Sequence, residues 1–287
     1  NRKAKMVEIK KISDLVWKIE KAGKMNIPIM IFANKRLLEK MKEDKTLIQA
    51  QNMSMLSGVI KNVIVLPDAH EGYGACIGGV SVMNLDTGVI SPGQIGYDIN
   101  CSVRLLRTNL KKEDILKRQK ELVDAIYRKI PSGVGRGSAF NVTRQELNKI
   151  LEGGAKYLVE KGYGVKDDYI HMEEEGCIKG ANAKNVSETA IRRGIGQLGT
   201  LGAGNHFLEI QFVDEIFDKE TAKVFGLKKN QVTIMIHCGS RGLGHQVASD
   251  YIKKMEDKYP DEIKSLPDRE LINAPINSKL GKEYFSA

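Results

Sequence analysis

Apolar residues fall into short β-branched runs and longer amphipathic stretches, and this pattern predicts a mixture of strands and helices. Residues 59–66 form a β-branched run that ends at Pro67, which is typical of a strand. Residues 113–130 carry apolar positions at helical spacing and stop before Pro131, as a helix would. Further strands are predicted at residues 78–85, 103–106, 206–213 and 232–237, and further helices at residues 34–56, 142–161, 187–193 and 246–258. Without a strict strand–helix–strand alternation, the pattern favours an α+β fold.

No internal repeat, low-complexity tract or Pro/Ser-rich linker interrupts this pattern, so residues 1–287 are predicted to form a single domain. The chain begins at Asn1 rather than Met and stops without a helix cap or charged tail. These two features raise the expectation that the chain is part of a longer protein, cut on its C-terminal side.

The composition excludes some classes of protein. Hydrophobic residues make up 41% and charged residues 28%, which are globular proportions. No run of about 18 apolar residues predicts a membrane span, and no apolar leader is visible, so we expect a soluble cytoplasmic protein. The formal net charge of +9 suits a polyanionic partner such as nucleic acid, although a Lys/Glu-rich surface would give a similar excess. The four cysteines have irregular spacing, which argues against a disulfide framework and against a zinc site built from cysteines.

The segment 96–101 is the first candidate for chemistry. Asp98 and Cys101 stand three residues apart and would face opposite sides of a plain strand. They converge only if the backbone bends, and the preceding residues 91–96 favour a bend over a helix. A carboxylate and a thiolate together can bind a divalent transition metal. The alternative is a turn aspartate and a buried cysteine.

Two further segments each place a histidine beside glycines. Residues 198–209 form a glycine-rich loop that leads to His206 at the head of a predicted strand, and the alternative is a hydrogen-bonded core histidine. Residues 232–242 form an apolar strand that ends in His237, followed by a Gly/Ser/Arg turn that opens a helix. That turn suits an anion. Cys238 should point away from His237 into the core.

Three other places are weaker candidates. Asp68, His70 and Glu71 lie in one predicted loop, which is either a substrate-end site or a hydrogen-bonded turn. His171 stands beside three glutamates and is interpreted as part of a solvated acidic loop. His245 is interpreted as a helix-surface or capping residue.

Taken together, these segments resemble the RtcB family of RNA ligases. The resemblance runs from about residue 47 to the end of the chain, and six motifs occur in the family's order. They are residues 67–74, 78–80, 96–104, 131–135, 198–209 and 237–249. The resemblance implies an RtcB-like fold, with mixed or antiparallel sheets flanked by helices around a central metal cleft.

The resemblance also implies an activity. The family joins RNA 3′-phosphate or 2′,3′-cyclic phosphate ends to 5′-hydroxyl ends through a histidine–GMP intermediate, using GTP and manganese. It acts in tRNA splicing and RNA repair, so the implied partners are RNA, including tRNA exon halves, and an archease-type activator. The implied cofactors are GTP and Mn²⁺, with two ions at a site of the two-metal kind.

Roles for individual residues follow from the same resemblance. The implied metal ligands are Asp98, Cys101, His206 and His237, with Cys101 as the bridge between the ions. The implied nucleotide contacts are Asn205, His206, Phe207, Leu208 and Glu209. The weaker candidates for contacts with the RNA ends are Asp68, Arg193 and Arg241.

The resemblance is incomplete. Ser102 stands where the family usually has glycine, and Ala69 and Glu71 vary the loop of residues 67–74. A further histidine ligand, the guanine pocket and the histidine that takes GMP have no counterpart, because the matching region lies beyond Ala287. The hypothesis is that this chain does not ligate alone. The alternatives are a metallophosphoesterase, on the Asp68–His70 and Asn205–His206 motifs, and a non-catalytic RNA-binding fragment.

Overall fold

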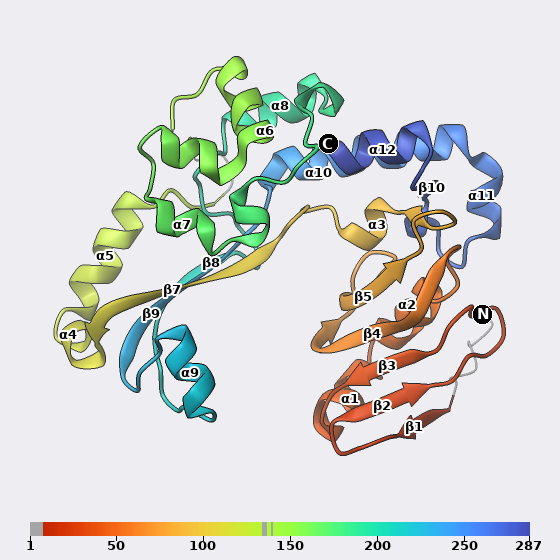
Figure 1. The fold of residues 1–287 in the computed structure, drawn as a ribbon, viewed down its shortest axis with the longest axis horizontal. Coiled ribbons are helices and arrows are strands. Elements are labelled where there is room, and N and C mark those ends of the chain that lie inside the picture. The colour runs from red at the N-terminus through yellow and green to blue at the C-terminus, as the bar shows by residue number, and fades with distance from the viewer. Residues whose placement is uncertain (1–7, 134–136, 139) are drawn as a thin grey trace. The chain divides into compact units, whose positions relative to one another are not determined.

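The computed structural model describes residues 8–133, 137–138 and 140–287, and the chain divides into two compact units (Figure 1). The first unit comprises Asn1–Tyr97, Gly180–Asn185 and Val247–Ala287, and the second comprises Asp98–Lys179 and Val186–Gln246. The sequence analysis drew no boundary within the chain. Because the segments of the two units alternate along the sequence, no single linker marks where one unit ends.

The first unit is built on a five-stranded mixed sheet with the strand order β1-β2-β3-β4-β5. β3 and β4 are parallel, and the other neighbours are antiparallel. The core side chains alternate along the central strands, where Ile29, Ile31, Val63 and Val65 are fully buried. The strands are β1 (Ile9–Lys11), β2 (Val16–Ile19), β3 (Ile29–Phe32), β4 (Val59–His70) and β5 (Ile77–Met83).

Two short helices contribute to the same core, namely α1 (Lys35–Met41) and α2 (Thr46–Met53). Asn34 caps α1 by accepting a hydrogen bond from the backbone N–H of Leu37 at 2.9 Å. The rest of the first unit contains shorter elements: β6 (Val89–Ile90), α3 (Pro92–Ile95), η2 (Ala183–Asn185), α11 (Pro260–Ser265), η3 (Arg269–Leu271), β10 (Ala274–Pro275) and α12 (Lys279–Ser286). β6 and β10 pair in a small antiparallel sheet.

The second unit is built on a three-stranded antiparallel sheet with the order β7-β9-β8. Its strands are β7 (Ser102–Lys111), β8 (Phe207–Phe212) and β9 (Gln231–Cys238). Its other elements are α4 (Lys112–Leu116), α5 (Gln119–Lys129), α6 (Arg144–Glu160), α7 (Lys166–Ile170), η1 (Glu173–Gly176), α8 (Glu188–Ile195) and α9 (Lys219–Phe225). The helix α10 (Arg241–Lys258) begins in the second unit and continues into the first.

The α+β prediction is confirmed, with mixed and antiparallel sheets accompanied by helices. The predicted helix at residues 34–56 is wrong in detail, because it is broken into α1 and α2. The predicted helix at residues 113–130 is similarly divided into α4 and α5. The strands β1, β2 and β3 were not predicted, because each is only three or four residues long and too short to show a clear period. Among the described residues, no helix is long and apolar enough to cross a membrane.

Candidate metal centre

The backbone turns sharply between Asp98 and Cys101. The N–H of Cys101 donates a hydrogen bond to the carbonyl oxygen of Asp98 at 3.0 Å, and Asn100 adopts a positive φ of 56°. The bend that the sequence predicts is therefore present, and it lets two side chains that a strand would separate approach one point. The expectation that no helix precedes it is wrong, since the short helix α3 ends at Ile95.

Strand pairing brings two histidines to the same end of the second unit's sheet. Phe207 lies opposite His237 in the ladder of β8 and β9, so His206 lies beside the end of β9. The two imidazole rings are edge to face, with their centroids 5.5 Å apart. Val103 lies opposite His237 on the other side, and this places Cys101, just before β7, at that end as well.

The sulfur of Cys101 contacts both rings. Its Sγ lies 3.3 Å from Nε2 of His206 and 3.1 Å from Nε2 of His237, and Oδ2 of Asp98 lies 2.8 Å from Nε2 of His206. In the part of the chain that the structure describes, Asp98, Cys101 and His206 form the one group whose ligand atoms all lie within 4.8 Å of one another. Four side chains from three separate segments of the sequence thus present donor atoms to one small volume.

Both histidines are held through their other ring nitrogen. Nδ1 of His237 donates to the backbone carbonyl of Asn205 at 3.0 Å, which leaves the Nε2 lone pair free for a metal. Nδ1 of His206 lies 3.9 Å from Sγ of Cys238, and the His206 side chain is only 6% exposed. Cys238 pairs with Ser102 and so points to the opposite face from His237, as predicted. The sequence analysis did not anticipate its contact with His206.

The turn at the start of α10 holds the carboxylate of Asp98. The hydroxyl of Ser240 and the backbone N–H of Arg241 each donate to Oδ1 of Asp98 at 3.0 Å. The sequence analysis expected this turn to suit an anion, and within the described residues the anion that it holds is Asp98. With Oδ1 occupied, Oδ2 is the oxygen turned toward His206. The hydroxyl of Ser240 supports Asp98. In the sequence, the only signal for this role is the position of Ser240 shortly after His237.

Two glycines make room for these ligands. A β-carbon at Gly239 would overlap the carboxylate of Asp98, and a β-carbon at Gly202 would overlap the ring of His206. Side chains pack directly against the backbone at both points, so only glycine fits.

The electrostatics of the site depend on whether a cation is bound. Burial and the neighbouring Asp98 carboxylate raise the pKa of the Cys101 thiol from its usual 9.0 to about 11. In the absence of a cation, Cys101 is therefore protonated at neutral pH. A bound divalent cation reverses this balance, because it favours the thiolate.

The donors fit a divalent transition metal. Thiolate, imidazole and carboxylate are the ligands that zinc and related ions take from proteins, and the two nitrogens and the sulfur converge from different directions. Donor type alone does not separate manganese from zinc. The assignment of these four residues as metal ligands stays a prediction that their geometry supports.

The predicted nucleotide contacts divide between two faces of the sheet. Phe207 and Glu209 share the face of His237, whereas Leu208 pairs with Ile236 and points to the other face. Asn205 is exposed. A nucleotide on the metal side would meet Leu208 only through its backbone.

The predicted RNA-end residues occupy different elements. Asp68 lies on β4 of the first unit. Arg193 lies on α8 and donates to Oε1 of Gln246 at 2.9 Å. Arg241 joins the metal centre through its backbone N–H, while its guanidinium lies 3.5 Å from the carbonyl oxygen of Gly133. Only Arg241 is connected to the predicted ligands by a hydrogen bond.

The remaining cysteine and histidine candidates have simpler structural surroundings. Cys76 is a buried core residue, and burial raises the pKa of its thiol to about 11. His171 and His245 are exposed. The predicted loop around Asp68 and His70 is wrong, because both residues lie in the strand β4, where Nδ1 of His70 lies 2.9 Å from the backbone oxygen of Asp68.

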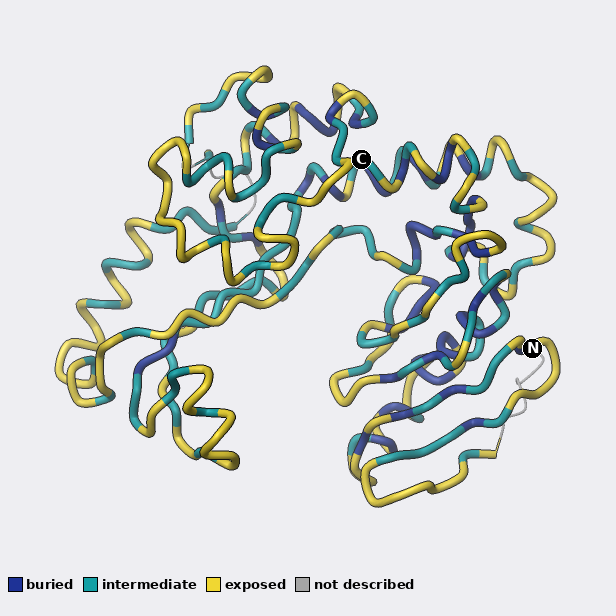
Figure 2. The backbone as a smooth tube through the Cα atoms, in the orientation of Figure 1, coloured by how far each residue is buried: buried dark blue, intermediate teal, exposed yellow. Residues whose placement is uncertain are grey.

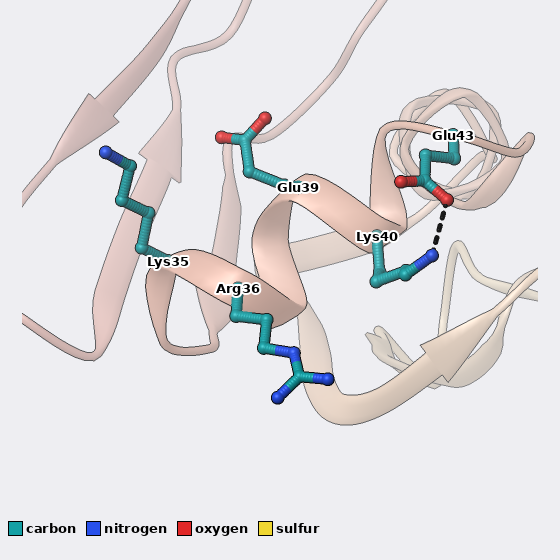
Figure 3. Close-up of a pocket in the computed structure, with 5 residues that line it drawn as sticks. All are labelled: Lys35, Arg36, Glu39, Lys40 and Glu43. Carbon is teal, nitrogen blue, oxygen red and sulfur yellow. Dashed lines mark hydrogen bonds and ion pairs between the residues drawn. The ribbon is translucent and has the colours of Figure 1, made fainter.

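A hollow lies along α1 in the first unit, and Figure 3 shows the side chains that line it. Lys40 and Glu43 form an ion pair at 2.9 Å. The lining residues are Lys35, Arg36, Glu39, Lys40 and Glu43. Charges of both signs on one exposed helix are typical of a solvated face, so this hollow carries no functional assignment.

Comparison with known proteins decides the family. The family profile described as tRNA-splicing ligase RtcB matches residues 49–287, which is most of the chain and crosses both units. The chain belongs to the RtcB family. This bears out the resemblance that the motifs indicated.

Individual relatives agree with this. The chain is 51% identical over 282 residues to the tRNA-splicing ligase RtcB of Nanoarchaeum equitans, covering 98% of this chain and 58% of that protein. It is 49% identical over 283 residues to that of Thermococcus kodakarensis, covering 98% and 59%. It is 49% identical over 242 residues to the RNA-splicing ligase RtcB homolog 1 of Entamoeba histolytica, covering 83% and 45%. The chain thus spans less than two thirds of the length of these relatives.

Proposed function

We propose that this chain carries most of the metal site of a GTP- and manganese-dependent RNA ligase, which joins 3′-phosphate or 2′,3′-cyclic phosphate ends to 5′-hydroxyl ends in tRNA splicing and RNA repair. The observation that carries the proposal is the position of Cys101, whose sulfur lies within 3.3 Å of a ring nitrogen of both His206 and His237. Membership of the RtcB family supplies the reaction class.

The ligands have separate tasks in this proposal. Cys101 is the one donor that contacts both histidines, so it is the group suited to bridge two ions. Asp98 adds negative charge and is oriented by Ser240 and the N–H of Arg241. Bound manganese would orient the triphosphate of GTP and offset the charge that develops on the transferred phosphoryl group. In this proposal, Asn205, Phe207 and Glu209 contact the nucleotide on the metal side of the sheet; the pairing of Phe207 with His237 supports this.

The proposal predicts recognition of the RNA end. In the presence of Mn²⁺, a short RNA with a 3′-phosphate should bind more tightly than the same RNA with a 3′-hydroxyl, because the terminal phosphate can reach the metal. Cys101→Ala should remove the difference, while Cys177→Ala, at a cysteine outside the site, should keep it. Fluorescence anisotropy with labelled RNA measures both affinities. Equal affinity for the two RNA ends would contradict the proposal.

We further propose that no histidine of this chain is the one that receives GMP. Both ring nitrogens of His206 and His237 have neighbours in the site, and His70, His171 and His245 belong to other surroundings. Incubation of the purified chain with GTP and Mn²⁺ should therefore give no covalent GMP adduct by intact-mass spectrometry. A GMP adduct on any of its five histidines would overturn this part of the proposal.

Two rivals have less support. A metallophosphoesterase would use Asp68 and His70, but among the described residues these two belong to no group of metal-ligating side chains. Phosphate release from the 3′-phosphate RNA without GTP would favour it. A non-catalytic RNA-binding role is compatible with the net charge of +9, and equal binding of both RNA ends would favour that role.

A further inference from the structure

The three-stranded sheet of the second unit has an apolar face opposite the metal centre. Cross-strand partners share a face, so Arg104, Ile236 and Leu208 lie together, as do Leu106, Ile234 and Ile210. His237 and its partners Val103 and Phe207 point the other way. We define the rear face by its seven apolar side chains, which are Leu106, Leu208, Ile210, Phe212, Val232, Ile234 and Ile236.

Within the second unit, most of the rear face is left uncovered by the described residues. Val232 is buried, at 3% exposed, but the other six side chains are not, and Leu106 and Phe212 are 43% and 38% exposed. Figure 2 shows β7 exposed along most of its length. Antiparallel sheets normally bury an apolar face against a second layer, and contiguous apolar surface of this kind marks an interaction site.

Two other features of the second unit also leave apolar or unpaired surface uncovered. The helix α5 is amphipathic, yet it contains no buried residue, and its Val123 and Tyr127 are 57% and 65% exposed. Among the strands of the described residues, β7 pairs only with β9, so its other edge has no partner strand there. An open, partly apolar edge strand is a site where another strand can pair.

At its metal end the rear face contains a pocket of about 300 Å³. Arg104 lines this pocket together with Asn100, Ser102 and Ser240. Arg104 makes no hydrogen bond or ion pair with any residue in the described ranges. A partner that covers the rear face therefore needs an acceptor for this guanidinium, and a carboxylate matches it best.

The lengths of the relatives indicate the occupant. This chain matches 58% and 59% of the Nanoarchaeum and Thermococcus ligases, so roughly two-fifths of each relative has no counterpart in the match. We infer that the rear face is the docking surface for a protein segment equivalent to that unmatched part, on the same polypeptide or on another. The segment adds an apolar layer over the rear face and sets a carboxylate against Arg104. This inference does not depend on metal binding.

Co-expression tests the inference. The full chain is produced together with the unmatched segment of the Nanoarchaeum ligase, and the complex is quantified by affinity capture of the chain. A soluble complex should form, and Leu106→Glu and Arg104→Glu should each weaken it by about tenfold or more. The control Leu85→Glu changes a leucine that is 72% exposed in the first unit, and it should have no effect.

A second measurement tests the inference even if the segment does not fold when it is produced as a separate chain. When the chain and the segment are fused in one polypeptide, Leu106 and Phe212 should be protected from carbene footprinting relative to the chain alone. Unchanged labelling of both residues would overturn the inference, as would a complex that survives Leu106→Glu. The chain alone could also form concentration-dependent dimers that Leu106→Glu disperses. Such dimers would identify a second copy of the chain as the occupant, and this result would overturn the inference as well. Loss of RNA-end discrimination with an intact complex would instead count against the proposed ligase function alone.

Discussion

Cys101 lies at the point where the other candidate ligands meet, with its sulfur 3.1 Å from Nε2 of His237 and 3.3 Å from Nε2 of His206. His206 and Asp98 contact each other directly, and His237 reaches the cluster through the sulfur. A change at Cys101 should therefore disturb metal binding more than a change at any other ligand.

Replacing Cys101 tests this directly. Cys101→Ala should lower affinity for Mn²⁺ or Zn²⁺ by at least about a hundredfold, since it removes a ligand rather than a supporting group, whose loss typically costs 10- to 100-fold. Isothermal titration calorimetry gives the affinities. The matched control is Cys177→Ala, which should bind metal as the unchanged chain does. Similar affinities for all three proteins would contradict the role of Cys101.

The pKa of Cys101 predicts a pH dependence of metal binding. Because its thiol has a pKa of about 11 without metal, binding at neutral pH must displace its proton. Below that pKa, the contribution of Cys101 should raise the affinity by about tenfold for each unit of pH. Competition titrations between pH 7 and pH 8.5 measure the slope, which should be shallower for Cys101→Ser. Equal slopes would show that the thiol is not a ligand.

The raised pKa of Cys101 also makes the stability of the metal-free protein depend on pH. The folded pKa of Cys101 lies above the usual 9.0 of a thiol, so its contribution to stability is complete below pH 9 and is lost as the pH rises through about 11. Metal-free Tm should therefore fall less over this range in Cys101→Ala than in the unchanged chain. Differential scanning fluorimetry measures the change.

At the scale of elements, the site is made where strands begin and end. Cys101 precedes β7, His206 precedes β8, and His237 lies near the end of β9, while α10 begins directly beyond the site. The loops between these elements have glycines where ligands need space. A short backbone at Gly239 and Gly202 lets Asp98 and His206 approach closely.

Gly239→Ala tests the contribution of the loop. The new methyl group would overlap the carboxylate of Asp98, and its displacement should lower metal affinity by about 10- to 100-fold. Gly196→Ala is the matched control, because its β-carbon would meet no atom within 4 Å. Retention of full metal affinity in Gly239→Ala, measured by calorimetry, would show that Asp98 is not a ligand or that the loop yields easily.

The sequence pattern could predict these elements better than their contacts. It placed β8, β9 and the bend before Cys101, because apolar runs and glycines mark them clearly. It did not predict that Ser240 and the N–H of Arg241 would hold Asp98, since that contact joins residues more than 140 positions apart. The register of β7 with β9 decides which side chains share a face with His237, and the pattern of β7 specifies it weakly because apolar residues such as Leu105 and Leu106 lie on both of its faces.

At the scale of the whole molecule, the chain is basic and is divided between two units, each with its own sheet. The motifs predicted the family more sharply than the hydrophobic pattern predicted the architecture. The alternating segments of the two units explain this difference, because local patterns do not show which distant segments pack together.

The net charge of +9 predicts how RNA binding responds to salt. Contacts between lysine or arginine and phosphate release counterions, so log affinity should fall linearly with log salt concentration. Anisotropy titrations of a labelled single-stranded RNA at several salt concentrations measure the slope. RNA affinity that does not change with salt would contradict a phosphate-based interaction.

The central claim is that Asp98, Cys101, His206 and His237 form a metal centre, and anomalous diffraction at the manganese edge tests it most directly. Crystals of the chain soaked in Mn²⁺ should show an anomalous peak within about 2.0–2.5 Å of Sγ of Cys101 and Nε2 of at least one of the two histidines. A well-ordered site without a peak, in crystals that bind manganese elsewhere, would contradict the account.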